Sequence, residues 1–445
     1  MNVTIWGINF SPEPTGIAPF TTDMAEAAVK HGFKTRVITG FPYYPHWKKR
    51  PGDRFRFFSK EKHAGVDVTR CWQYVPQKTG ALRRILHEAS FGVTSFMRAL
   101  WAPRSDLYIV ISPPLILGVF GWMVAKLKRS EFVFHVQDLQ PDAAVGLGMV
   151  SGGGFVALLY KIEKFIYERA AVVSGISQGM MRAFAKKGVP SERRLLFPNW
   201  TRDKEGASPN QQLAQMAVPS FRQQHGIGAN DFLAVYSGNI GRKQGLGVLV
   251  EAAELLAREQ APGGKRVKIV IAGAGAGLAE LKEKAAAAKL DNLIITPLLD
   301  DLSYASMLRT AQVGLITQVS GTGQYFFPSK LLTLLQAGLP LVTVADRDSE
   351  LADAVESGGF AINVEPNQPR ALADAMSSLC DSPERLAQMA RDCRWVDRFR
   401  RDAVLPKFFA QMTELIERGN APIGEERPLP QSMGAIDEQR AHAGR

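Results

Sequence analysis

Short apolar segments alternate with longer segments of helical periodicity along almost the whole chain. The short segments are rich in Val, Ile, Leu and Phe, which is typical of buried strands, and the longer ones carry apolar residues three or four positions apart, which is typical of helices. In the first half we predict strands at residues 3–7, 35–39, 66–71, 107–111, 132–136, 172–175 and 195–197, and helices at 21–31 and 155–170.

The same alternation starts again after residues 201–220, a polar segment rich in Gln, Asn, Ser and Pro. There we predict strands at residues 232–237, 267–272, 293–296, 313–317, 341–344 and 361–364, and helices at 246–259, 278–289, 328–337 and 349–357. Strands that alternate with helices form doubly wound parallel sheets. The pattern therefore predicts an α/β protein with two Rossmann-like domains, residues 1–200 and 201–393, facing a cleft that binds ligands. Residues 419–445 hold few large apolar side chains and are predicted to be disordered.

Two segments are candidates for contact with a membrane. Residues 107–125 are apolar and long enough to span a bilayer, but Pro113 and Pro114 interrupt them. We interpret this segment as a strand, a loop and a helix, with surplus apolar residues at 116–122 that would allow contact with lipid. Residues 83–101 mix basic side chains with Phe, Met and Trp, as interfacial helices do, although packing on the sheet would explain the pattern equally well.

The charge is uneven along the chain. The net charge is +11, yet residues 1–200 hold 27 basic and 14 acidic side chains, or +13, and the remainder carries −2. A basic half predicts an anionic partner, either a nucleic acid, a phosphorylated substrate or an anionic membrane, and a solvated surface is the alternative. Three cysteines without CxxC spacing exclude a disulfide scaffold and a zinc knuckle. Because the first ten residues also lack a secretory leader, we expect these cysteines to be reduced and cytosolic.

A glycine-rich turn follows the strand predicted at residues 232–237. It contains Gly238, Asn239, Arg242 and Lys243, and it leads into a predicted amphipathic helix. Glycines let backbone N–H groups approach a ligand closely, and a helix N-terminus with two cations favours an anion. We predict that these four residues bind a diphosphate. An ordinary strand-to-helix turn with two solvated cations is the alternative.

A second glycine turn in this half looks at first like a dinucleotide-binding motif. Gly273, Gly275 and Gly277 read GxGxG, whereas dinucleotide-binding folds have GxGxxG, and Asp291 precedes a strand instead of ending one. A nicotinamide site is therefore not favoured. We interpret Gly273 as part of a close turn that faces a nucleotide.

A third turn combines a glycine-containing loop with the start of a helix. The loop leads to Pro328, which suits the first helical position, and then to Ser329, Lys330 and Leu331. A helix start with a cation beside a loop favours an anion. We expect Ser329, Lys330 and Leu331 to contact the sugar or nucleotide of a donor, and a capped loop without a ligand is the alternative.

Polar residues in the first half follow predicted strands and so lie at the carboxyl edge of the sheet. Gly16 lies in a loop after the first strand, and residues 41–50 form an aromatic and basic loop that suits a sugar or a lipid phosphate. His135 and Asp138 lie at or just after the strand at residues 132–136, and both are candidate catalytic residues because polar groups at strand ends commonly face a site. His135 is equally compatible with a satisfied histidine in the core.

In this order the motifs resemble the family 4 retaining glycosyltransferases of GT-B fold. The similarity rests on the segments SPEPTGIAPF, VSGISQGMMRAFAKKGV, FPNW, SGNIGRKQGL and PSKLLTLLQAGLPLV, and it covers roughly residues 1–415. The chain looks closest to the exopolysaccharide branch, which includes colanic-acid-type fucosyltransferases and related aminosugar transferases.

The resemblance implies transfer of a sugar from a nucleotide-diphosphate donor to an acceptor hydroxyl, with retention of configuration and without a metal or other cofactor. Arg242 and Lys243 would stabilise the leaving diphosphate. The second domain would bind the donor and the first the acceptor, and a last helix, residues 394–418, would cross back to the first domain. With the basic first half, this implies a lipid-linked glycan acceptor and no nucleic acid. It also implies a position peripheral to the anionic cytoplasmic face of the inner membrane.

The sequence departs from the family pattern near the donor. Asn239 and Gln244 stand where many members have an arginine and a lysine in the diphosphate loop. Tyr325 and Thr333 stand where the wider family has two glutamates that contact the donor sugar and ribose. Gln137 stands where a histidine often precedes the aspartate after the first-domain strand. The contacts of the donor must therefore be made by other side chains and by backbone amides.

Two other functions stay open on the sequence alone. A sugar-nucleotide epimerase of the same fold would use Asp138 and Asp142 as acid and base. A non-catalytic assembly subunit would explain the missing glutamates. An RNA-binding protein would explain the charge but not the two sugar-nucleotide-like loops.

Overall fold

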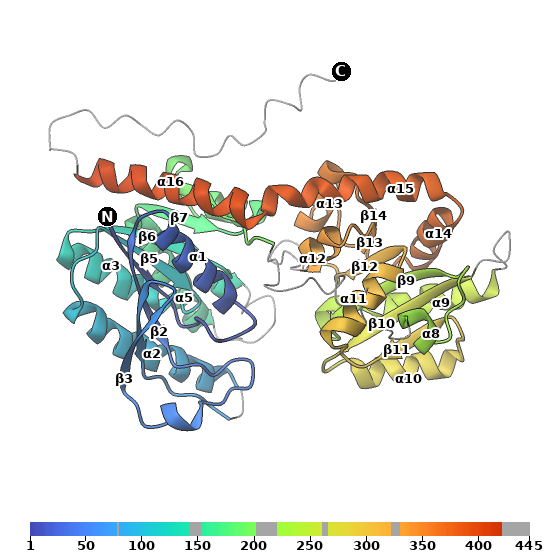
Figure 1. The fold of residues 1–445 in the computed structure, drawn as a ribbon, viewed down its shortest axis with the longest axis horizontal. Helices are drawn as coiled ribbons and strands as arrows, with labels where there is room; N and C mark the ends of the chain where they lie inside the picture. The colour runs from blue at the N-terminus through green and yellow to red at the C-terminus, as the bar shows by residue number, and fades with distance from the viewer. Residues whose placement is uncertain (78–79, 143–152, 202–219, 260–265, 322–329, 421–445) are drawn as a thin grey trace, which may run out of the picture. The chain divides into compact units, whose positions relative to one another are not determined.

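The computed structural model describes residues 1–77, 80–142, 153–201, 220–259, 266–321 and 330–420. The chain forms two compact units, one made of Met1–Trp200 and Arg401–Arg445 and the other of Thr201–Arg400. Each unit has a central sheet with helices on both of its faces (Figure 1).

The sheet of the first unit has eight strands in the order β3-β4-β2-β1-β5-β6-β7-β8. Their bounds are Asn2–Trp6 (β1), Lys34–Gly40 (β2), Phe58–His63 (β3), Val66–Cys71 (β4), Leu107–Ser112 (β5), Glu131–Val136 (β6), Val172–Gly175 (β7) and Arg194–Leu196 (β8). All neighbours pair in parallel except β3, which pairs with β4 in the antiparallel sense. The sequence analysis missed β3, because this edge strand reads FSKEKH and has no buried residue to give an apolar pattern.

Helices cover the two faces of this sheet. They are α1 (Ala18–Lys30), α2 (Ala81–Trp101), α3 (Ile116–Lys128), α5 (Gly153–Arg169), α6 (Gln178–Lys186) and α16 (Arg401–Asn420), with 3₁₀ turns at Pro51–Asp53 and Ser191–Arg193. Leu107 and Ile109 of β5 belong to the core that contains α1 and α16, whereas Tyr108 and Val110 belong to the core that contains α2, α3, α5 and α6. The strict alternation buries both faces, as expected for a parallel sheet.

The second unit has six parallel strands in the order β11-β10-β9-β12-β13-β14. The strands are Phe232–Asn239 (β9), Val267–Ala274 (β10), Leu293–Thr296 (β11), Val313–Thr317 (β12), Leu341–Val344 (β13) and Ala361–Val364 (β14). The helices are Phe221–Gln224 (α8), Gly247–Arg258 (α9), Leu278–Ala288 (α10), Asp301–Thr310 (α11), Lys330–Gln336 (α12), Glu350–Gly358 (α13), Pro369–Cys380 (α14) and Pro383–Asp392 (α15), with 3₁₀ turns at Arg242–Gln244 (η3) and Cys393–Phe399 (η5). One core joins the sheet to α9, α10, α14 and α15, and another joins it to α8, α11, α12, α13 and η5.

The helix that ends the described chain packs on the first unit. Phe408 of α16 stacks on Phe197 with ring centroids 3.8 Å apart, and Arg401 forms ion pairs with Asp23 and Glu26 of α1. The single helix expected over residues 394–418 is two elements, η5 and α16, because Arg400 between them has an extended backbone. Of the tail expected to be disordered, the first two residues complete α16 and residues 421–445 lie outside the described residues.

The apolar segment 107–125 consists of β5 and most of α3, separated at Pro113 and Pro114 as expected. Within the described residues, no helix combines the length and the apolar character that crossing a bilayer requires.

Candidate functional site

The carboxyl ends of β9 and β10 meet in the second unit. The two strands pair in parallel, so that Gly273 lies opposite Gly238 and Ala274 opposite Asn239. Gly273 is buried, and a β-carbon on it would overlap the carbonyl oxygen of Gly238. A β-carbon on Gly275 would overlap the carbonyl oxygen of Ile240 in the same way. The second glycine turn therefore supports the first from beneath, and the structure places Gly273 as a packing residue of this loop.

Lys330, the first residue of α12, lies over the same loop. Its ammonium donates a hydrogen bond to the hydroxyl of Tyr236 (2.7 Å), and that hydroxyl donates one to the carbonyl oxygen of Asn239 (2.6 Å). The Nζ atom lies 4.0 Å from the centroid of the Tyr236 ring, an approach that favours a cation. Gly238 has φ +131°, and a β-carbon there would overlap the end of the Lys330 side chain. Glycine at this position lets the cation lie against the backbone of the loop.

Partial burial changes the pKa of Lys330. Removal from water lowers the pKa of its ammonium from 10.5 to about 8, and desolvation is the cause of the shift. An anion bound beside Nζ would raise this pKa again, because it stabilises the charged form. The site therefore favours an anionic ligand at the carboxyl ends of β9 and β10.

The rest of the loop is held by the end of β12 and the residues after it. The backbone N–H of Gly241 donates to Oε1 of Gln244 (3.1 Å), and the hydroxyl of Thr317 donates to the carbonyl oxygen of Gln244 (2.5 Å). The backbone N–H of Val319 donates to the carbonyl oxygen of Lys243 (3.0 Å). These bonds fix the loop just before α9 begins at Gly247, so that a helix N-terminus follows it.

The structure brings together four residues that the sequence analysis named: Gly238, Asn239, Lys243 and Lys330. Arg242 begins η3 within the loop, but its side chain lies outside the described part of the structure, as does the whole of Ser329. Leu331 is a correction. Its side chain is fully buried in the core of the second unit, because the residue after Lys330 points toward the sheet, and it is not available to a ligand.

His135 is also a correction. It is only 1% exposed, its Nδ1 lies 2.9 Å from the hydroxyl of Ser174, and its Nε2 lies 2.8 Å from Nε2 of Gln137. The amide of Gln137 donates in this second bond, so Nδ1 carries the proton of a neutral ring. Burial lowers the pKa of His135 to about 3. This histidine is a core residue that orients Gln137, not a group that reaches a substrate.

Asp138 and Asp142 differ in their surroundings. Asp138 is the second residue after β6 and is exposed at the carboxyl edge of the sheet. Asp142 pairs with Nζ of Lys187 (2.5 Å), which also pairs with Glu163 (2.6 Å). The pair engages Asp142 in packing α5 and α6, whereas Asp138 remains the candidate for contact with a substrate.

Gly16 lies in a loop that buried polar groups hold in place. It has φ +70° and is exposed, and its neighbour Glu13 is 6% exposed. One carboxylate oxygen of Glu13 accepts the backbone N–H groups of Tyr43 (2.8 Å) and Tyr44 (2.9 Å), which ties this loop to the aromatic loop after β2. Burial raises the pKa of Glu13. The sequence analysis missed Glu13, although a carboxylate inside a glycine loop was the available signal.

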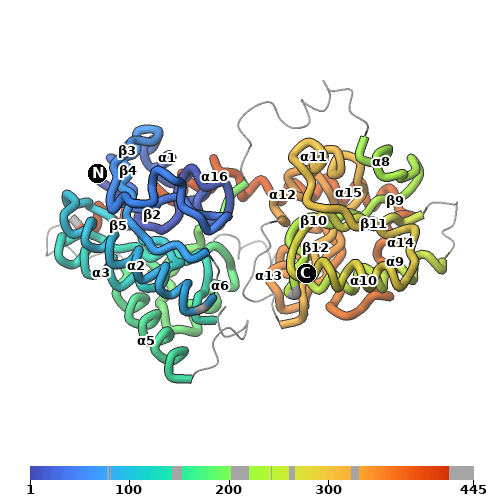
Figure 2. The backbone as a smooth tube through the Cα atoms, turned by 90° about the horizontal axis from the view of Figure 1, so that it is seen from below, coloured from blue at the N-terminus to red at the C-terminus, as the bar shows by residue number. Residues whose placement is uncertain are grey.

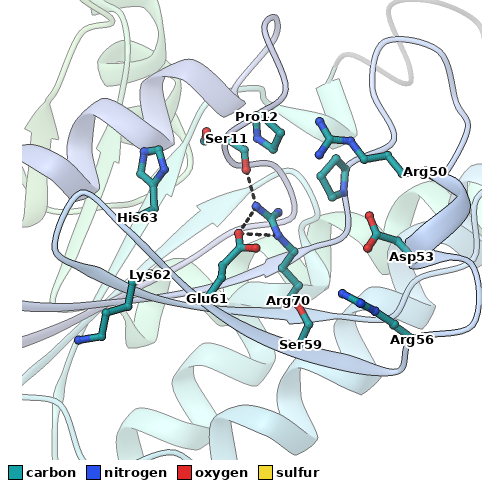
Figure 3. A pocket seen from close by; sticks show the side chains of 11 residues that line it. Ser11, Pro12, Arg50, Asp53, Arg56, Ser59, Glu61, Lys62, His63 and Arg70 are labelled. Atoms are coloured by element: carbon teal, nitrogen blue, oxygen red, sulfur yellow. Dashed lines mark hydrogen bonds and ion pairs between the residues drawn. The ribbon is translucent and has the colours of Figure 1, made fainter.

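A cavity of about 330 Å³ lies beside this loop in the first unit (Figure 3). Arg70 of β4 forms one wall, where it donates to Glu61 of β3 (2.8 Å) and to the carbonyl oxygen of Ser11 (2.6 Å). Arg50 and Arg56 line the cavity on the side of the loop that precedes β3. Its polar and charged lining suits a ligand with many hydroxyl groups. The basic loop at residues 41–50 was named from the sequence, but the cavity itself was not predicted, since Glu61 and Arg70 meet only through the missed strand β3.

The described residues contain no cluster of side chains that could bind a metal ion. Among them, no three His, Cys, Asp or Glu side chains lie close enough together to hold an ion. Among the described residues, positive groups near the glycine loop include the side chains of Lys243 and Lys330 and the start of α9.

Comparisons with known proteins agree with the two-unit fold. Residues 15–200 match the family model described as "Glycosyl transferase 4-like domain", and residues 218–394 match "Glycosyl transferases group 1". WcaI of Escherichia coli (strain K12), whose name describes a colanic acid biosynthesis glycosyl transferase, is 34% identical over 381 residues, 84% of this chain and 90% of that protein.

Two solved structures share the fold. Sucrose-phosphate synthase from Thermosynechococcus elongatus superposes with a TM-score of 0.68 at 16% identity, over 94% of this chain and 99% of that one. Anabaena Alr3699/HepE in complex with UDP gives a TM-score of 0.62 at 15% identity, over 93% of this chain and 100% of that one.

Proposed function

We propose that this chain, which belongs to the family 4 glycosyltransferases, transfers a sugar from a nucleotide-diphosphate donor to a hydroxyl of a lipid-linked glycan. The transfer retains the anomeric configuration and serves the biosynthesis of an exopolysaccharide or other cell-surface polysaccharide. The observation that carries the proposal is the position of Lys330, a partly buried cation hydrogen-bonded to Tyr236 over Gly238.

The donor's diphosphate is the anion that fits this site. Lys330 and Lys243 provide cationic donors, and the backbone at the start of α9 provides N–H groups. UDP is bound in the Anabaena structure of the same fold, which supports a nucleoside diphosphate as the ligand class. Because the two donor-site glutamates of the family are absent, the sugar and ribose contacts fall to other groups of this unit.

The reaction is a displacement at the anomeric carbon. The bond from this carbon to the outer phosphate oxygen breaks, and the acceptor oxygen bonds to the carbon on the same face. The acceptor proton leaves with the departing diphosphate, whose growing negative charge Lys330, Lys243 and the helix N-terminus stabilise. We assign to Asp138 a hydrogen bond to a hydroxyl of a reacting sugar. Because side chains and amides carry the charge, we expect activity without an added metal ion.

The acceptor side of the proposal rests on the first unit. Its residues 1–200 carry a net charge of +13, which favours the anionic cytoplasmic face of the inner membrane, where lipid-linked glycans are presented. The polar cavity between Arg70 and Arg50 fits the hydroxyl groups of a glycan. The epimerase alternative is weakened, since Asp142 is engaged by Lys187.

A binding screen followed by a transfer assay tests the function. The purified chain is titrated with UDP-, GDP- and dTDP-sugars in the presence of EDTA, and the donor that binds is incubated with a lipid-linked glycan extract. Transfer with the donor's anomeric configuration, read by NMR, is the expected result. Conversion of the donor without acceptor would instead identify an epimerase, and the absence of binding by every donor would identify an assembly subunit.

A further inference from the structure

Helix α2 exposes a continuous apolar stripe to solvent. The helix is 21 residues long, and its exposed apolar residues recur at intervals of three or four, so that they share one face. The members of this α2 stripe are Leu82, Ile85, Leu86, Ala89, Val93, Met97, Leu100 and Trp101. Leu82 is 71% and Trp101 84% exposed, values that a core face does not show.

The opposite face of α2 packs against the rest of the first unit. Phe91 and Ala99 are fully buried in the core beneath the helix, and the hydroxyl of Thr94 donates to the carbonyl oxygen of Trp72 (2.6 Å). Nδ1 of His87 bonds to the carbonyl oxygen of Tyr74 (2.5 Å). The helix is therefore fixed in its rotation, and the stripe is an outer surface that the fold itself leaves uncovered.

The neighbouring helix α3 extends the apolar surface. The two helices lie side by side (Figures 1 and 2), and Phe96 of α2 stacks on Phe120 of α3 with ring centroids 4.8 Å apart. Met123 is 37% and Leu127 69% exposed on α3. The surplus apolar residues that the sequence analysis placed at 116–122 mostly pack inward: Leu117 is fully buried, and no residue of that segment is an exposed large apolar one.

The charges on these two helices have one predominant sign. The basic residues are Arg83, Arg84, Arg98, Lys126 and Lys128, and the acidic one is Glu88. Glu88 is satisfied within the fold, since Nε of Arg84 and Nε2 of Gln140 donate to it. An exposed apolar stripe on helices with an excess of basic residues is the pattern of a helix that lies in the interface of an anionic bilayer. A second copy of the chain fits less well, because pairing these faces would bring like charges together.

We infer that the α2 stripe, with Met123 and Leu127 of α3, is the surface by which this chain docks on an anionic lipid bilayer. The helix lies in the plane of the interface over a length of about 30 Å, and Trp101 anchors its carboxyl end. The inference deepens the proposed function, on which it rests, by assigning the membrane contact to a defined face.

The docking face is connected to the carboxyl edge of the sheet. His87 lies 4.5 Å, between ring centroids, from Tyr43 in the aromatic loop after β2. Glu88 accepts a hydrogen bond from Gln140, two residues after Asp138. A bilayer against α2 would therefore lie near the loops that we assign to the acceptor, which is where a lipid-linked glycan would be delivered.

The test measures binding of the full chain to vesicles. Wild type is sedimented with vesicles of phosphatidylcholine alone and with vesicles containing equal amounts of phosphatidylglycerol. We expect binding to the anionic vesicles that falls with salt, and a loss of about tenfold or more in the variant Leu86→Gln, Val93→Gln, Met97→Gln. Leu298→Gln, which changes an apolar residue that is 67% exposed in the second unit, is the matched control and should bind as wild type does.

A second pair of measurements separates docking from folding and from catalysis. Trp101→Ser alone should weaken vesicle binding, and nucleotide-sugar binding should be unchanged in every stripe variant because the donor site is in the other unit. Vesicle binding by the triple variant equal to that of wild type would overturn the inference. So would equal binding of wild type to both vesicle types, or a wild-type dimer that the triple variant disrupts. Failure of the wild type to bind anionic vesicles, with donor binding intact, would refute only this inference, whereas docking of the wild type without donor binding would refute only the proposed function.

Discussion

The ammonium of Lys330 lies 2.7 Å from the hydroxyl of Tyr236, and that hydroxyl reaches the backbone of Asn239. Two residues 94 positions apart thus hold the glycine loop and a partly buried cation in one arrangement. The relationship explains why Gly238 and Lys330 occur together, because only glycine leaves room for the lysine side chain.

Replacing Lys330 by methionine should weaken binding of the donor nucleotide by about 10- to 100-fold, since one charge-assisted hydrogen bond is lost. Tyr236→Phe should have a smaller effect, because it removes the positioning hydroxyl but leaves the cation. Isothermal titration calorimetry with the donor identified in the screen measures both. Lys282→Met, at an exposed lysine of α10, is the matched control, and an equal loss there would contradict the assignment.

Donor binding should also depend on pH through Lys330. The pKa of this partly buried ammonium is lowered to about 8 in the free protein, so the amine loses its charge as the pH rises above that value. Bound diphosphate favours the charged form, and affinity should therefore be highest below pH 8 and fall by up to about tenfold per pH unit above it. Binding above pH 8 should take up a proton, which titrations in buffers of different ionisation enthalpy detect. Lys330→Met should abolish this dependence.

The effect of Lys330 on the stability of the fold has the opposite pH dependence. The pKa of Lys330 in the folded chain lies below the ordinary value of 10.5, so the partly desolvated charge destabilises the fold below pH 8. This cost is relieved as the pH rises from 8 toward 10.5. The free energy of unfolding contributed by this group should therefore increase over the range in which donor binding decreases, and urea titrations of wild type and Lys330→Met distinguish the two trends.

Gly273→Ala should destabilise the second unit by about 3 kcal/mol or more and abolish donor binding, because the new β-carbon would overlap the carbonyl oxygen of Gly238. Gly247→Ala is the control. A β-carbon there meets only the end of the Lys284 side chain at 3.3 Å, and alanine favours the helix. Thermal unfolding followed by circular dichroism measures the stability of both variants. Equal stability of the two would contradict the close packing of Gly273 against Gly238.

His135 should govern stability at acid pH and not catalysis near neutrality. Its pKa is about 3 in the folded chain against an ordinary 6.5, so the unfolded chain binds more protons between these values. Stability is therefore lost as the pH falls from 6.5 toward 3, by up to about 1.4 kcal/mol per pH unit for this group. His135→Gln should show a shallower fall in urea denaturation experiments. An exposed control, His46→Gln, should keep the slope of wild type.

Asp138→Asn should lower kcat/KM for sugar transfer by on the order of 100-fold and leave the melting temperature unchanged, because the residue is exposed. Asp142→Asn should do the reverse. It breaks the pair with Lys187, which lowers stability by about 1–3 kcal/mol, while activity is retained. Loss of activity in Asp142→Asn without loss of stability would revive the epimerase mechanism.

The fold class was accessible from the sequence. The strands β4, β7, β11, β12, β13 and β14 have the bounds that the apolar pattern predicts, and the GT-B class of two α/β domains is confirmed by the structure and its neighbours. Both sheets are buried on both faces, so nearly every strand is an apolar run that can be recognised locally. The exception, β3, is an exposed edge strand whose pairing depends on a partner and not on its own composition.

Only part of the site could be predicted from the sequence. The glycine turns and Lys330 were visible because glycine and charge at a strand end are local signals. Tyr236 and Glu13 were not, since a tyrosine in a buried strand reads as core and the partners of Glu13 are about thirty residues away.

By itself, the sequence determined the alternation of strands and helices, the family and the loops that end the strands. Tertiary structure alone decided which polar residue at each strand end is buried and which is exposed. It placed His135 in the core and Asp138 at the surface three residues later, and Lys330 over a loop while Leu331 packs beneath it. The physical reason is that burial depends on the direction of a side chain relative to neighbouring elements. The position of each residue on its strand, helix or loop fixes that direction. Hydrophobic periodicity, by contrast, describes the apolar face of a whole helix or strand and not the burial of one residue at its end.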